Sequence, residues 1–231
     1  MQKPFVMYVN TSSRSNSVVG DIDCEVNTGL SDHTGCTHKI RIAVFGHSWC
    51  NYIGKSQQGI TYNYMKQQTV GEFEIKYIGV PGGKVGTIQN TRCWDNLIEY
   101  RPHMTYVILG GNDISPNTDC KVLAHALHEL GTAVKERTTS DYMICSIEDR
   151  PNPRRLDHAV YKNKKNKTNR HLKYINKHRY LLLPVVGYKE DGVHPNTEAT
   201  HIVHERFVNF TRRWLERSEH TLELQLPTLA S

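Results

Sequence analysis

The pattern of apolar and polar positions divides most of the chain into short apolar runs separated by longer amphipathic segments. Five runs have the length and the β-branched or aromatic content of strands: 40–45, 72–80, 105–110, 141–146 and 180–184. Four segments place apolar residues at helical spacing: 85–100, 120–137, 160–178 and 197–217. The polar, tyrosine-containing stretch 49–68 is expected to be partly helical.

This alternation of strands and helices predicts an α/β fold, a three-layer α/β/α sandwich around a parallel five-stranded sheet. Strands separated by helices pair in parallel through right-handed crossovers. Five strands fit a flavodoxin-like order 2-1-3-4-5, with the run 72–80 toward an edge. In that order the first strand lies between the second and the third, so the loops that follow these three strands meet at one cleft.

The length of 231 residues suits one domain with short extensions. Residues 1–37 are rich in Ser, Thr, Asn, Gly and Asp and predict a poorly structured N-terminal extension. We expect the domain at 38–218 and a C-terminal tail at 219–231. Because no apolar run could cross a bilayer and none resembles a secretory signal, we expect a cytoplasmic protein without a membrane partner.

Six cysteines are scattered along the chain without a Cys-x-x-Cys pair, which argues against a disulfide scaffold and against a zinc ribbon. Cys24, His33, Cys36 and His38 lie close together in the sequence, but their spacing matches no zinc pattern. We therefore expect free thiols and no metal site.

The net charge of +6 is unevenly distributed. Between Arg150 and Arg179 there are eleven Lys or Arg residues and one acid, Asp157, whereas acids outnumber bases in the rest of the chain. Such a segment can meet the phosphate backbone of a nucleic acid. A solvated helix face is the simpler interpretation, because only Tyr161 and Tyr174 offer aromatic rings for base stacking.

Four candidate sites follow the predicted strands. Ser48 lies just beyond the first strand and Gly46, a position where serine is usually a turn residue or a helix cap. After the second strand, Gly82 belongs to a glycine turn that lacks the spacing of a phosphate-binding P-loop but could present backbone N–H groups to an anion. After the third strand, Asn112 follows two glycines and could offer an amide donor, although Asn-Asp is also ordinary turn chemistry.

The fourth site is Asp191-Gly-Val-His194, before the last helix. A carboxylate three residues before a histidine can hold one ring nitrogen and leave the other to act as a base. A hydroxyl, two oxyanion donors and this pair at one edge of a sheet make the set that acyl transfer requires. His201 and His204 are expected on the surface of the last helix, since no metal-binding pattern accompanies them.

The order Gly46-His47-Ser48, Gly82, Gly110-x-Asn112-Asp113 and Asp191-x-x-His194 resembles the four sequence blocks of the SGNH, or GDSL-like, hydrolases. The resemblance runs from about residue 39 to 217. It implies Ser48 as the nucleophile, His194 as the general base and Asp191 as its orienting partner. It also implies an oxyanion hole made by Ser48, Gly82 and Asn112, no cofactor, and a small-molecule ester as substrate, which we expect to carry a short acyl chain.

Two departures from the family pattern stand beside Ser48. His47 replaces the usual Asp, which is not a triad member, so the hydrogen bonding around Ser48 is expected to differ. Trp49 and Cys50 are expected to change the mouth of the site, and the tyrosines of 49–64 to border it. The blocks GHSW, GGNDIS and DGVHPN further resemble SGNH domains of animal retrotransposon-encoded proteins. The alternative function is an SGNH-like module, weakly active or inactive, that binds nucleic acid through 150–179.

Overall fold

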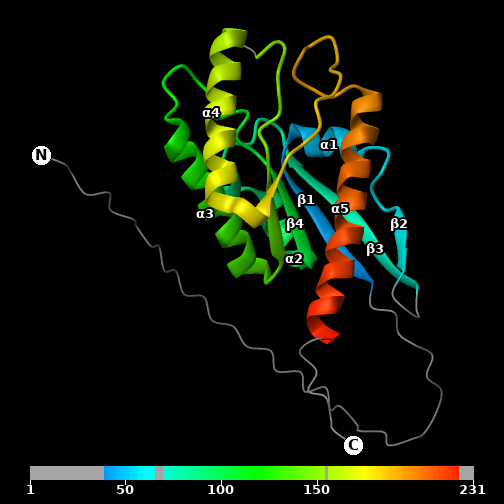
Figure 1. Ribbon diagram of the computed structural model, residues 1–231. Coiled ribbons are helices and arrows are strands. Elements are labelled where there is room, and N and C mark those ends of the chain that lie inside the picture. Colours follow the sequence, from blue (N-terminus) through cyan, green and yellow to red (C-terminus); the bar gives the residue numbers. More distant parts are fainter. Residues whose placement is uncertain (1–38, 66–69, 154–155, 224–231) are drawn as a thin grey trace, which may run out of the picture. The chain divides into compact units, whose positions relative to one another are not determined.

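A computed structural model describes residues 39–65, 70–153 and 156–223, and these residues contain a six-stranded sheet (Figure 1). The strands lie in the order β2-β3-β1-β4-β5-β6. β2 pairs with β3 antiparallel, and every other neighbouring pair is parallel. The strand bounds are β1 Ile40–His47, β2 Thr61–Met65, β3 Val70–Val80, β4 Met104–Ile108, β5 Asp141–Cys145 and β6 Tyr180–Leu181.

The five predicted strands are present in the predicted order, as β3-β1-β4-β5-β6. The sixth strand, β2, lies in the stretch that the sequence predicts as partly helical. Only the start of that stretch is helical, and Tyr62 and Tyr64 then alternate with Thr61 and Asn63 along β2. This alternation fits an edge strand, because Tyr64 is buried against the core and Thr61 and Asn63 are exposed.

Within the described residues, four α-helices lie between strands and a fifth, α5, follows the last strand. Their bounds are α1 Ser48–Gly54, α2 Arg92–Tyr100, α3 Cys120–Thr138, α4 His158–Asn176 and α5 Thr197–Glu223, with short 3-10 turns at Ile88–Asn90 and Lys177–Arg179. α5 continues beyond its predicted end at residue 217 into the segment predicted as a tail. The predicted extension 1–37 and its Cys24–His38 cluster lie outside the described residues. Within the described ranges, none of the helices has the length and apolar character of a membrane span.

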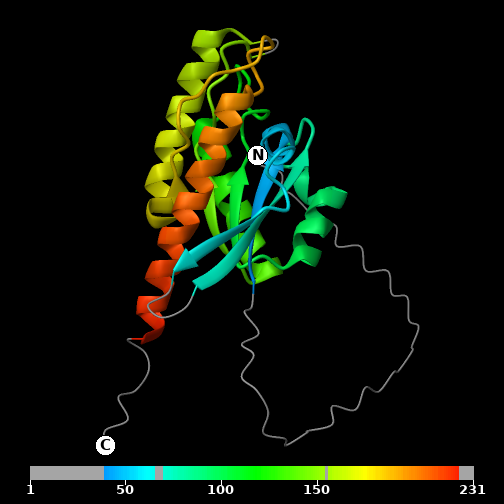
Figure 2. The ribbon, with the colours of Figure 1, turned by 90° about the vertical axis from the view of Figure 1, so that its right-hand side faces the viewer.

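Helices cover both faces of the sheet, which confirms the predicted three layers (Figures 1 and 2). Ile42 and Val44 of β1 pack in a core that α1 and α5 complete. Ala43 and Phe45 point to the opposite face, into a core shared with α2, α3 and α4. Because all four are fully buried, β1 is the central strand, and its carboxyl end lies in the interior of the fold.

The carboxyl end of β1 lies unusually close to β4. Gly46 pairs with Ile108, and a Cβ atom at Gly46 would overlap the carbonyl oxygen of Ile108. Only glycine allows this approach, which brings the residues after β1 beside those after β4.

Gly46→Ala should therefore lower the free energy of unfolding by about 2 kcal/mol, because the added methyl must force two paired strands apart. Urea unfolding followed by circular dichroism measures this loss. Gly86→Ala is the matched control: a Cβ atom there meets no atom within 4 Å, so stability should stay within about 0.5 kcal/mol of wild type. Equal effects of the two substitutions would contradict the close approach.

Candidate active site

Ser48 is the first residue of α1 and follows β1 without an intervening loop. Its position is therefore set by a strand whose last six residues are all buried. His47, the last residue of β1, caps α1: its ring Nδ1 accepts a hydrogen bond from the backbone N–H of Trp49, at 3.3 Å. The Ser48 side chain is thus held where a rigid strand becomes a rigid helix.

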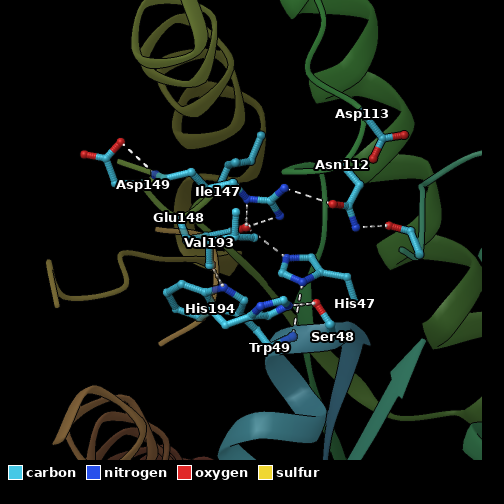
Figure 3. Close-up of polar contacts among 12 residues, drawn as sticks. His47, Ser48, Trp49, Asn112, Asp113, Ile147, Glu148, Asp149, Val193 and His194 are labelled. Carbon is cyan, nitrogen blue, oxygen red and sulfur yellow. Dashed lines mark hydrogen bonds and ion pairs between the residues drawn. The ribbon is translucent and has the colours of Figure 1, made fainter. Parts of the chain in front are cut away.

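Ser48, His194 and Asp191 form a hydrogen-bonded chain (Figure 3 shows its Ser48–His194 contact). Ser48 Oγ lies 3.0 Å from His194 Nε2, and His194 Nδ1 lies 2.6 Å from Asp191 Oδ2. Asp191 Oδ1 accepts hydrogen bonds from the backbone N–H groups of Val193 and His194, both at 2.9 Å. The structure thus joins the three residues that the sequence predicts as a triad, and the geometry suits proton transfer from the hydroxyl to the imidazole.

The carboxyl group of Asp191 is held ionised. Its partial burial opposes ionisation, but the backbone and ring N–H groups of His194 and the backbone N–H of Val193 outweigh it and lower the pKa of Asp191 well below its usual range. An ionised Asp191 orients the ring of His194 and stabilises the imidazolium that forms when His194 takes a proton.

Trp49 and Tyr52 of α1 fix the loop that carries the histidine. The indole Nε1 of Trp49 donates a 2.9 Å hydrogen bond to the carbonyl of Val193, and the ring of Tyr52 stacks on that of His194 with centroids 4.3 Å apart. Trp49 and Cys50 are expected to change the mouth of the site, but both are buried and neither lines the cavity described below. Trp49 instead links the helix of the nucleophile to the loop of the base.

A cavity of about 330 Å³ opens beside Ser48. Ser48, Gly82, Asn112 and His194 all line it, so the structure brings the predicted oxyanion residues to the predicted nucleophile. Gly82 has a φ of 68°, a conformation that favours glycine. The apolar part of the wall consists of Pro81, Ile114, Pro153, Leu156, Tyr161 and Val193.

The side-chain amide of Asn112 has a defined orientation. Its Oδ1 accepts a 2.9 Å hydrogen bond from Arg150 Nη1, and its Nδ2 donates a 3.0 Å hydrogen bond to the carbonyl of Gly83. Because arginine can only donate, the oxygen must face Arg150, which leaves the second N–H of Nδ2 for the cavity. Asp113 holds the same two loops together by accepting from the backbone N–H of Val85.

Two further residues adjoin the site that the sequence motifs do not single out, Glu148 and Arg150. Glu148 is 4% exposed and Arg150 6% exposed, and the ring of His47 lies against the Glu148 carboxylate (Figure 3). Arg150 was grouped with the basic segment 150–179, although it is buried. The acid–base pair two residues apart just after a predicted strand was the available signal.

His204 corrects another expectation. It is 2% exposed rather than on the helix surface, with its ring nitrogens against the hydroxyls of Tyr62 and Tyr77. Burial, with a smaller contribution from His201, lowers the pKa of His204 to about 4. His201 is exposed, as predicted. Tyr62 and Tyr64 therefore pack in and against the core instead of bordering the cavity.

In the described part of the chain, no three His, Cys, Asp or Glu side chains are grouped so as to hold a metal ion.

Solved structures of bacterial esterases share this fold. The chain aligns with a GDSL-like lipase from Bacteroides thetaiotaomicron at 15% identity and a TM-score of 0.54, over 75% of this chain and 88% of that one. It aligns with the esterase EstA from Pseudoalteromonas sp. at 15% identity and a TM-score of 0.53, over 76% and 98%. It aligns with Axe2, an acetylxylan esterase from Geobacillus stearothermophilus, at 13% identity and a TM-score of 0.51, over 74% and 93%.

No protein-family model matches the sequence, and a search of curated proteins finds no match. At the identities above, the likeness defines the fold alone. The chain has the α/β fold found in GDSL-like lipases and esterases, with a mostly parallel central sheet.

Asp191→Asn should make stability less dependent on acid pH. A carboxyl group whose pKa is lowered by folding stabilises the protein fully above its unfolded value of about 4, and this contribution is lost as pH falls toward the folded value. The stability of wild type relative to Asp191→Asn should thus be largest near pH 7 and shrink below about pH 4. Urea midpoints at pH 7, 5 and 3 test this. Glu190→Gln, an exposed neighbour, is the control, and a constant difference would contradict the assignment.

Proposed function

We propose that this chain is a serine esterase of the SGNH type that hydrolyses a carboxylic ester with a short acyl group. The observation that carries the proposal is the chain of hydrogen bonds from Ser48 through His194 to Asp191 at the wall of a cavity that Asn112 and Gly82 also line. The fold shared with bacterial esterases supports it.

In the first half of the proposed reaction, His194 Nε2 takes the proton of Ser48 as Oγ attacks the ester carbonyl. The oxyanion that forms accepts hydrogen bonds from the backbone N–H groups of Ser48 and Gly82 and from the side-chain amide of Asn112. As the C–O bond to the alcohol breaks, the leaving oxygen takes the proton from His194. In the second half, His194 deprotonates a water that attacks the carbonyl of the acyl-enzyme. As the C–O bond to Ser48 breaks and the acid leaves, His194 returns the proton to Ser48 Oγ.

The cavity supports a short acyl group. It measures about 330 Å³, and much of its wall is apolar. Pockets that bind drug-sized ligands are commonly larger, up to roughly 1,000 Å³. Axe2, with the same fold, is an acetylxylan esterase. Acetyl and other short acyl esters are therefore the substrates we propose. The blocks GHSW, GGNDIS and DGVHPN support a place among the SGNH domains of animal retrotransposon-encoded proteins.

A fluorophosphonate probe should label Ser48 of the wild-type chain, because only an activated hydroxyl attacks phosphorus at a useful rate. Peptide mass spectrometry locates the label. Ser48→Ala and His194→Ala should abolish both the label and the hydrolysis of p-nitrophenyl acetate, whereas Ser115→Ala, an exposed serine outside the cavity, should change neither. A folded wild-type chain that neither takes the label nor hydrolyses the ester would refute the proposed function.

A second candidate function, nucleic-acid binding, is favoured by the outer face of α4. Tyr174 on this helix is 77% exposed, among basic side chains that are also exposed: Lys162, Lys167, Arg170, Lys173 and Lys177. Part of the charge of 150–179 is used inside the fold, since Arg150 is buried and Lys165 pairs with Asp149 at 3.2 Å. The remaining stripe supports weak, sequence-independent contact with phosphates.

Single-stranded RNA should bind the chain with an affinity that falls as salt rises, because phosphate contacts release counterions. Fluorescence anisotropy at 50 and 200 mM salt measures this dependence. The triple variant Lys167→Glu/Arg170→Glu/Lys173→Glu should bind about tenfold or more weakly. The α3 variant Lys121→Glu/Lys135→Glu/Arg137→Glu, an equal change in charge, should lose less affinity. Ser48→Ala should bind like wild type. Equal losses in the two triple variants would rule out a site on α4.

A further inference from the structure

Four polar side chains connect the helix of the nucleophile to the oxyanion hole. Glu148 Oε1 lies 3.2 Å from His47 Nε2 and accepts hydrogen bonds from Arg150 Nε at 2.9 Å and Arg150 Nη2 at 2.5 Å. Arg150 then donates from Nη1 to Oδ1 of Asn112 at 2.9 Å. The connection thus runs from His47 through Glu148 and Arg150 to Asn112, behind the cavity that Asn112 and Arg150 both line.

The direction of each contact is determined by chemistry. Since His47 Nδ1 accepts from the backbone of Trp49, the ring proton belongs on Nε2, which faces the carboxylate of Glu148. This contact is at ion-pair distance but is not aligned as a hydrogen bond. Arg150 uses its guanidinium as a fork, with one side on Glu148 and the other on Asn112.

The loop that carries Glu148 and Arg150 is held by the inner face of α4. Asn169 accepts from the backbone N–H of Ile147 at 2.8 Å and donates to its carbonyl at 2.9 Å. The hydroxyl of Tyr161 donates to the carbonyl of Glu148 at 3.2 Å. These hydrogen bonds fix the position of the backbone that carries Glu148 and Arg150.

The pair also lies against Gly111, in the turn that follows β4. A Cβ atom at Gly111 would overlap Glu148 Oε1 and Arg150 Nη2. The two charged groups therefore pack directly on the backbone next to Asn112, and a side chain at 111 would displace their ends. Burial raises the pKa of the Glu148 carboxyl, but the adjacent His47 ring and Arg150 guanidinium outweigh this and hold it well below its usual range.

We propose that Arg150 and Glu148 are positioning residues for hydrolysis at Ser48. Arg150 holds the amide of Asn112 so that Nδ2 faces the oxyanion, and Glu148 holds Arg150 together with the His47 ring that caps the helix of Ser48. This inference rests on the proposed function. Arg150 thus has two roles, to neutralise Glu148 and to orient Asn112. A lysine at 150 can balance the charge of Glu148, but it cannot donate to Glu148 and Asn112 at once as a planar guanidinium does.

Steady-state hydrolysis of p-nitrophenyl acetate by Arg150 variants provides the first test. Arg150→Met should lower kcat about 10- to 100-fold and leave KM within about threefold, because the amide is needed in the transition state more than in the ground state. Arg150→Lys should have a thermal stability close to that of wild type but a kcat as low as that of Arg150→Met. Arg92→Met, which removes an arginine from an exposed pair with Glu99, should change neither. Recovery of kcat in parallel with stability would mean that Arg150 is only structural.

A double-mutant cycle with Asn112→Ala provides the second test. If Arg150 acts through the amide, Arg150→Met should change kcat by less than about twofold once the amide is gone. The full loss in that background would overturn the proposal. If Arg150→Met does not fold, the pair Glu148→Gln/Arg150→Met leaves no unpaired buried charge and is used in its place. Suppose that Ser48→Ala is inactive but the effects of the Arg150 and Asn112 substitutions on kcat simply add. The positioning role is then refuted and the proposed function is not. A wild-type chain that shows neither hydrolysis nor probe labelling refutes both proposals.

Discussion

The close approach of β1 and β4 at Gly46 is the constraint on which the site depends. The backbone of Gly46 contacts that of Ile108, and a side chain at 46 would push the two strands apart. The segments that follow β1 and β4 therefore lie side by side, and Ser48 and Asn112 both line one cavity. A wider separation would leave both strands intact but would move the hydroxyl away from the amide. The sheet thus contributes to the chemistry through its spacing as well as its rigidity.

The charged groups near Ser48 are arranged around the buried carboxylate of Glu148. An isolated carboxylate in the interior would cost several kcal/mol, so Glu148 needs partners on more than one side. Arg150 supplies two N–H donors, and His47 faces the carboxylate from the end of β1. His47 is thereby useful where the family pattern has Asp, since a second carboxylate at that position would face Glu148 and repel it.

Five of the six strands and the grouping of the candidate site residues at one cavity could be predicted from the sequence. Parallel strands end at one edge of a sheet, so Ser48, Asn112 and the Asp191–His194 pair could be placed together from strand order alone. The failures have a common cause, which is that side-chain direction depends on tertiary packing. His204 and His201 lie three residues apart on α5, yet one is buried and the other exposed. Similarly, Trp49 could not be distinguished from a pocket residue until α1 was packed against the sheet, and β2 could not be recognised without β3 beside it.

The segment 150–179 shows why net charge alone is a poor guide to function. Its first arginine is buried at the candidate site, and its inner helical face holds the loop 147–150 through Tyr161 and Asn169. Among the described residues of this segment, most of the exposed charge lies on the outer face of α4 and in the turn that follows it. The inner face of α4 is therefore connected to Asn112: a ligand that shifted α4 would also shift the loop carrying Arg150, and with it the amide of Asn112. Contact with phosphates on the outer face would leave this amide in place as long as the bonds from Asn169 to Ile147 remained intact.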